Sequence, residues 1–254
     1  DIKKVLERLV REPRVEIVQF DYRYAAAAIP NDPQFPVLWG LHNTGQSGGT
    51  VGADINAPEA WDVTQGSSTV IVAVLDSGVD YTHPDLAANM WTNPGEIPGN
   101  GIDDDGNGYV DDFYGVNVIT GAAAPGNPID DHGHGTHVAG TAAAVGNNST
   151  GVVGVSWNAR IMAIKILDAR GVGYTSDAVR GITYALDKGA RILNNSYGGY
   201  SYDAALLSAI QTANNAGALF VAAAGNDGSN NDVQPLYPAS HNVPNVLAVE
   251  ATPE

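Results

Sequence analysis

Apolar and polar positions along this chain alternate between a strand pattern and a helix pattern. From residue 36 onward, short apolar runs are separated by stretches in which apolar residues recur every three or four positions. The predicted strands cover residues 70–75, 161–167, 191–195, 218–224 and 246–249. The predicted helices begin at 57 and cover 136–145, 176–188 and 202–216, with Ser176 and Asp177 as a cap and Gly189 and Gly217 as terminators. This order predicts an α/β fold, a mainly parallel sheet with helices on both faces.

The N-terminal segment differs from the rest of the chain. It contains six of the 12 lysine and arginine residues. Residues 5–9 show the spacing of a short amphipathic helix, residues 15–22 form a run typical of a strand, and four alanines follow at 25–28. We therefore expect an N-terminal extension over residues 1–28 and one domain over residues 29–254.

Composition narrows the classes of function. With 28 acidic and 12 basic residues the formal net charge is -16, which disfavours nucleic acid and anionic lipid as partners. The apolar runs are far shorter than the roughly 18 residues that a membrane span requires. The chain has no cysteine, which excludes disulfides, thiolate metal ligands and a cysteine nucleophile.

Two polar residues at the ends of predicted elements form a candidate catalytic pair. Asp76 ends the first apolar strand, and His134 lies between two glycines at the start of a helical pattern. Together they could supply a general base and the carboxylate that orients it, although an Asp after a strand is also common in turns. Zinc binding is disfavoured because His134 and His137 are three residues apart with no glutamate between them. We expect His137 to be a hydrogen-bonded structural residue one helical turn deeper.

A second candidate site lies in the acidic run 103–112. Oxygen-bearing side chains occupy positions one, three, five and nine of this run and glycine occupies position six, as in an EF-hand calcium loop. The closing glutamate of that loop is missing, so Asp112 or a carboxylate elsewhere has to complete the shell. An acidic turn without a metal is the alternative. The candidate ligands are Asp103, Asp105, Asn107, Tyr109, Asp111 and Asp112.

Four segments together give the chain a family resemblance. They are Val-Leu-Asp-Ser-Gly at 74–78, His-Gly-Thr-His-Val-Ala-Gly-Thr at 134–141, Asn-Ser-Tyr-Gly-Gly at 195–199 and Val-Ala-Ala-Ala-Gly-Asn at 221–226. These segments occur in the order that the subtilisin-like serine proteases show. Over roughly residues 30–254 the chain resembles that family, most closely its thermitase-like branch.

The resemblance implies roles for particular residues in the cleavage of a peptide or protein substrate. Asp76 would orient the imidazole, His134 would act as general base and then acid, and Asn226 would donate its side-chain amide to the oxyanion. For Asn226 an ordinary turn is the alternative, as it is for the Gly-Gly pair at 198–199. The implied substrate edge and apolar primary pocket, with a broad preference for hydrophobic residues, consist of Ser196, Tyr197, Gly198, Gly199, Ala223, Ala224 and Gly225.

The resemblance also implies a calcium site, an inhibitor and a location. The implied ligands are the side chains of Asp32, Asp85 and Asn148 and the carbonyls of Val145, Thr150 and Val152. Residues 1–28 resemble the tail of an inhibitory propeptide that runs through the cleft, which suggests a zymogen; an ordinary extension is the alternative. An extracellular location follows from the family alone.

The serine nucleophile of the family is not evident in this sequence. No segment like Gly-Thr-Ser-Met occurs before Glu254, so we expect a subtilisin-like domain whose C-terminal part is missing. The prediction is a calcium-stabilised serine endopeptidase that is inactive as this fragment. A non-catalytic peptide-binding or calcium-binding module is the alternative. A nucleotide-binding protein is less favoured, because no Gly-x-Gly-x-x-Gly or Gly-Lys-Ser/Thr signature is present.

Overall fold

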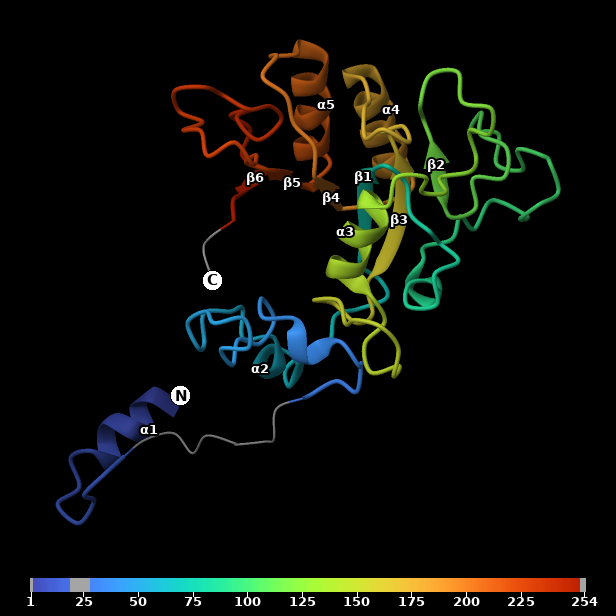
Figure 1. The fold of residues 1–254 in the computed structure, drawn as a ribbon. Coiled ribbons are helices and arrows are strands. Elements are labelled where there is room, and N and C mark those ends of the chain that lie inside the picture. The colour runs from blue at the N-terminus through green and yellow to red at the C-terminus, as the bar shows by residue number, and fades with distance from the viewer. Residues whose placement is uncertain (1, 19–27, 252–254) are drawn as a thin grey trace.

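A six-stranded parallel sheet forms the centre of the molecule (Figure 1). The structure is a computed structural model that describes residues 2–18 and 28–251. The strand order is β2-β3-β1-β4-β5-β6, and every neighbouring pair is parallel. The strands are β1 (Ile71–Asp76), β2 (Gly115–Asn117), β3 (Arg160–Lys165), β4 (Ile192–Asn195), β5 (Leu219–Ala223) and β6 (Val246–Val249).

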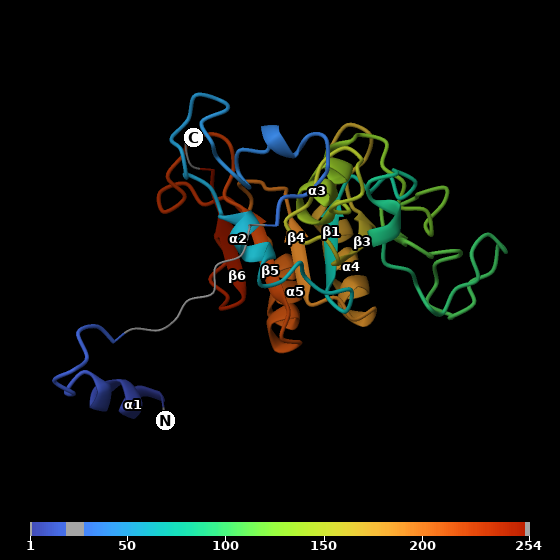
Figure 2. The ribbon, with the colours of Figure 1, turned by 90° about the horizontal axis from the view of Figure 1, so that it is seen from below.

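Helices cover both faces of this sheet, α3 on one side and α4 and α5 on the other (Figure 2). Each side has its own apolar core, because parallel strands bury both faces. Ala139 of α3 packs with Val74 and Ile161 on one side, and Ile182 and Ile210 pack with Phe220 on the other. The helices are α1 (Ile2–Leu9), α2 (Ala57–Trp61), α3 (His134–Ala143), α4 (Thr175–Asp187) and α5 (Ala204–Asn215), with short 3-10 helices at Phe35–Val37 and Ala87–Asn89.

The predicted α/β class and all five predicted strands of the domain are confirmed within two residues at each end. One detail is wrong. Helix α4 begins after Tyr174, and neither Ser176 nor Asp177 caps it. The Asp177 carboxylate lies inside the first turn, where it is buried and accepts hydrogen bonds from the backbone and hydroxyl of Thr120. Asp177 therefore ties the helix to the loop after β2.

Strand β2 was not predicted from the sequence. It contains three residues, too few to show an apolar alternation, and it forms because its backbone lies close to β3. Gly115 has a φ of 133°, and a Cβ at this position would lie 1.9 Å from the carbonyl oxygen of Ala163. Only glycine allows this approach.

The N-terminal segment is described in part. The predicted helix is present as α1, which lies away from the sheet in both views (Figures 1 and 2). Residues 15–18 form no strand, and the rest of the predicted strand and Ala25 to Ala27 fall outside the described residues. None of the helices in the described part of the chain has the length and apolar character needed to cross a bilayer.

Candidate active site

Asp76 and His134 meet at the carboxyl end of the sheet. Asp76 is the last residue of β1 and is fully buried, whereas His134 begins α3 and its side chain is 45% exposed. His134 Nδ1 lies 2.7 Å from Asp76 Oδ1, and the Ser77 amide donates to the same oxygen at 2.7 Å. In the neutral ring this contact favours the tautomer with its proton on Nδ1, which leaves Nε2 able to accept a proton. The predicted pair is therefore formed.

The start of α3 is organised by Asp130, which sequence reasoning missed. One carboxylate oxygen of Asp130 accepts the amides of His132 and Gly133, and the other accepts the amide and hydroxyl of Thr136. Burial opposes ionisation of Asp130, but these hydrogen bonds outweigh it and lower its pKa from 3.8 to about 2. Its spacing before the helix was the available signal, because Asp is favoured at helix N-termini.

His137 does not lie where we predicted. It is exposed on α3 and lines a separate apolar hollow with Leu38, Leu41 and Gly140. His137 therefore does not join His132 and His134, which line one cavity. Of the residues that the structure describes, no histidine belongs to a group that could hold a metal ion.

His134 and part of the predicted substrate edge line one cavity of about 550 Å³. The loop 170–175 forms one wall and the segment 196–199 forms another. The ring of Tyr197 packs against the apolar core, and its hydroxyl donates to Asn195 at 3.1 Å. Burial and the charge of Asp76 raise the pKa of Tyr197. The proton of the Tyr197 hydroxyl is therefore already used within the protein.

The segment 236–237 completes this wall and was not foreseen. Gly199 and Tyr237 exchange two backbone hydrogen bonds, each of 2.8 Å, so the polar backbone groups of Gly199 are already used. A Cβ on Gly198 would lie 2.9 Å from Leu236 Cδ2, and one on Gly225 would lie 2.8 Å from it. Of the predicted substrate edge, Gly199 is thus paired with Tyr237, and Leu236 packs against both Gly198 and Gly225.

Asn226 lies at the edge of the neighbouring hollow. Ala223 ends β5, and Ala224, Gly225 and Asn226 follow it; the last three line this hollow with Leu236. Tyr200 lines both hollows, so the two are adjacent. The side chain of Asn226 is exposed and makes no hydrogen bond within the described residues. The three predicted catalytic residues therefore all lie at the carboxyl end of the sheet.

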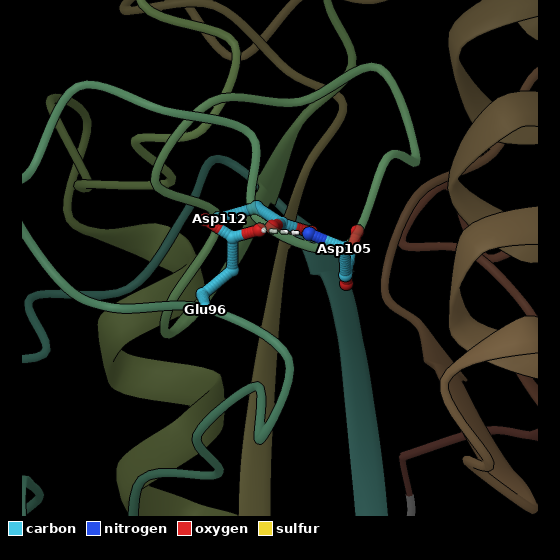
Figure 3. Close-up of side chains that lie close together, drawn as sticks. All are labelled: Glu96, Asp105 and Asp112. Atoms are coloured by element: carbon cyan, nitrogen blue, oxygen red, sulfur yellow. Dashed lines mark hydrogen bonds between the residues drawn. The ribbon is translucent and has the colours of Figure 1, made fainter.

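Three carboxylates gather in the loop between β1 and β2. Atoms of Glu96, Asp105 and Asp112 all lie within 4.8 Å of one another (Figure 3). Glu96 Oε1 accepts the amides of Asp104 and Asp105, whereas its buried Oε2 has no partner in the described structure. This cluster could hold a metal ion, because carboxylate oxygens are ligands for hard cations.

Neutral and cationic groups partly compensate the negative charge of this cluster. Asn93 Nδ2 donates to Asp105 and Asp112, and the Tyr184 hydroxyl donates to Asp112 at 2.6 Å. Burial and this hydrogen bond raise the pKa of Tyr184. Lys188 pairs with Asp105.

The sequence-predicted ligand set of this loop is only partly brought together. The Asp103 carboxylate accepts the amides of residues 106–108, and that of Asp111 accepts the amides of residues 100–101. The Asn107 oxygen accepts the amide of Tyr109 while its amide donates to Asp112. Glu96 joins the cluster instead. It lies seven residues before the acidic run, outside the EF-hand spacing, which explains why the pattern did not reveal it.

Two members of the second predicted calcium set contact the loop that carries the other four. Asp32 and Asp85 are 2% and 1% exposed, and both bind the loop 145–152. Asp32 accepts the amides of residues 147 and 148, and Asp85 accepts the Asn148 side chain at 2.8 Å and the Val152 amide at 2.9 Å. The carbonyls of Val145 and Thr150 accept no hydrogen bond from the described residues, and neither does that of Val152.

Fold and site together define an α/β protein with a buried Asp–His pair at the carboxyl end of a parallel sheet. The model of the subtilase family matches residues 67–254, which is most of the chain and includes the pair. The chain belongs to the subtilase family.

Relatives support this assignment over nearly the whole chain. A thermophilic serine proteinase of Bacillus sp. (strain AK1) is 38% identical over 99% of this chain and 53% of its own length. Thermitase of Thermoactinomyces vulgaris is 38% identical over 88% of this chain and 65% of its own length. An extracellular protease of Xanthomonas campestris pv. campestris is 35% identical, over 99% and 43% respectively. The chain thus spans about half the length of these relatives.

Proposed function

We propose that the protein is a subtilisin-like serine endopeptidase, with residues 1–254 supplying all of the site except the nucleophile. The observation that carries this proposal is the 2.7 Å contact between a fully buried carboxylate and a half-exposed imidazole in a cavity. His134 Nε2 takes the proton of a serine hydroxyl as that oxygen attacks the peptide carbonyl, and later donates it to the leaving amine. Asp76 holds the ring and stabilises the imidazolium.

The substrate binds, in this proposal, as an extended peptide. Main-chain groups of Ser196 to Gly198 pair with it, and its side chain enters an apolar pocket formed by Gly198, Ala223 to Gly225 and Leu236. The Asn226 amide donates to the oxyanion. Support comes from the shared cavity of His134 and segment 196–199, and from the packing of Leu236 against Gly198 and Gly225.

Calcium is the proposed stabilising ion, at two places. One is the cluster of Glu96, Asp105 and Asp112, where the unpartnered Glu96 oxygen would become a ligand. The other is the Asp32, Asp85 and Asn148 set, with the free carbonyls of loop 145–152. Both sets offer only oxygen, which suits Ca²⁺. Bound cations would also reduce the electrostatic repulsion within a chain whose net charge is -16.

Secretion and autoinhibition complete the proposal. A relative is named an extracellular protease, and residues 1–28 would act as part of an inhibitory propeptide. The same protein with its propeptide attached should hydrolyse peptides more slowly than the processed form.

The test is peptide hydrolysis by the protein expressed together with its downstream coding sequence. We expect activity that falls by about 10⁴-fold or more in Asp76→Asn and His134→Ala, a magnitude taken from other Asp-His-Ser proteases. Leu219→Ala, at the start of β5 and therefore at the opposite end of the parallel sheet from the pair, serves as a control for general destabilisation. Downstream sequence in which the serine is replaced, with peptide binding but no hydrolysis, would support the non-catalytic module instead.

A further inference from the structure

A buried lysine lies beside the Asp76–His134 pair and has no part in the proposed acyl transfer. Lys165 ends β3 and is 4% exposed. Its ammonium donates to the Ser77 carbonyl at 2.6 Å, the Asp131 carboxylate at 2.6 Å and the Leu167 carbonyl at 2.9 Å. All three donors of the ammonium are therefore satisfied. Lysine is almost never this buried unless it is paired, so these contacts keep it in place.

The register of the sheet places this cation on the same side as Asp76. In the β1–β3 pairing Asp76 lies opposite Lys165, and paired residues of neighbouring strands project to the same face. Two residues earlier, Val74 and Ala163 both belong to the core beneath α3. Asp76 is fully buried and its Oδ2 has no hydrogen-bond partner in the described structure. The ammonium of Lys165 and this carboxylate therefore lie on one face of the sheet, at neighbouring strand ends.

The three acceptors belong to segments that hold the pair from different sides. Ser77 follows Asp76, donates its amide to Asp76 Oδ1, and accepts the Gly135 amide through its hydroxyl at 2.9 Å. Asp131 begins the turn that leads into His134. Leu167 lines the same cavity as His134. One ammonium thus links the end of β1, the start of α3 and the floor of the cavity.

We propose that Lys165 is a positioning residue, whose three hydrogen bonds hold Ser77 and Asp131 so that the His134 ring keeps its proton on Nδ1, directed at Asp76. This inference rests on the proposed function of the pair. Other charged or titratable side chains near the Asp76–His134 pair are Asp130, Asp131, Tyr197 and His132, and the His132 ring lies 6.3 Å from that of His134. Asp130 holds the α3 backbone, whereas Lys165 holds the junction between the strands and that helix.

The test is the tautomer of His134, measured through ring ¹⁵N shifts in histidine-labelled protein, with His134→Gln used for assignment. We expect the neutral ring of the wild type to carry its proton on Nδ1. In Lys165→Met more than half of that population should move to the Nε2 form, and Lys165→Arg should recover most of it. Arg180→Met is the matched control, because Arg180 also makes several hydrogen bonds, on the opposite face of the sheet.

A purely structural role gives a different result. If Lys165→Met keeps its near-ultraviolet circular dichroism and the wild-type Nδ1 population, the proposal is overturned even when the melting temperature falls. If that variant does not fold, Asp131→Asn decides, since its partly exposed side chain is easily replaced. A shift toward the Nε2 form in that variant supports the proposal, and an unchanged tautomer overturns it. Neither result depends on peptide hydrolysis, so the outcome is separate from that of the proposed function.

Discussion

The Asp76–His134 cleft and the acidic cluster both hold buried carboxylates, but the negative charge is compensated in different ways. At the cleft, Asp76 has His134, the Ser77 amide and the nearby ammonium of Lys165. At the cluster, three carboxylates share Asn93, Tyr184 and Lys188, and one oxygen of Glu96 has no partner in the described structure. Each region contains one buried carboxylate oxygen without a partner in the described structure, Asp76 Oδ2 and Glu96 Oε2. Such an oxygen is costly to bury. The two regions differ because the cleft holds one such carboxylate beside an ammonium, whereas in the cluster three carboxylates share the ammonium of Lys188.

The first way to sharpen this comparison is to remove the proposed oxyanion donor. Asn226→Ala should lower kcat of the active protein by about 10²- to 10³-fold, a loss known for such a donor in subtilisin and not obtained from this structure. The melting temperature should stay within a degree, because the side chain is exposed. Steady-state kinetics with a peptide substrate provide the measurement. A change in KM alone would argue that Asn226 only binds substrate.

Calcium titration should separate the two regions. At a free calcium concentration one hundred times Kd, a single site stabilises the fold by about 2.7 kcal/mol, and thermal melting with calcium against chelator measures this. Glu96→Gln should remove the part of this calcium-dependent stabilisation that comes from the cluster of Glu96, Asp105 and Asp112. Asp104→Asn is the matched control, because Asp104 is exposed in the same loop and outside the cluster. Equal calcium responses in Glu96→Gln and wild type would contradict the cluster as a site.

The lowered pKa of Asp130 predicts that the protein loses stability in acid, through a carboxylate at the cleft. Its folded pKa of about 2 lies below the ordinary value of 3.8, so the folded state binds this proton less readily than the unfolded state. The resulting stabilisation is present at neutral pH and is lost as the pH falls from about 4 to about 2. Asp130→Asn should be less stable at pH 7 and should lose less stability across that range, as measured by urea unfolding. A slope equal to that of the wild type would rule out this contribution.

The sequence predicted the cleft better than the cluster, for a physical reason. Asp76 and His134 each stand at the end of a strongly patterned element, and parallel topology brings such ends to one edge of the sheet. The cluster is built from loop backbone, where Asp103 and Asp111 turn toward amides and Glu96 enters from outside the acidic run. Leu236 and Tyr237 were likewise missed, because pairing between two loops leaves no periodic pattern.

Labelling by an active-site-directed phosphonate tests the central claim most directly, namely that residues 1–254 hold the base and its partner but not the nucleophile. Mass spectrometry should find one phosphonate per molecule, on a serine beyond residue 254, when the downstream sequence is included, and no label on the 254-residue chain. His134→Ala should abolish the labelling. Stoichiometric labelling of the 254-residue chain itself would contradict the account.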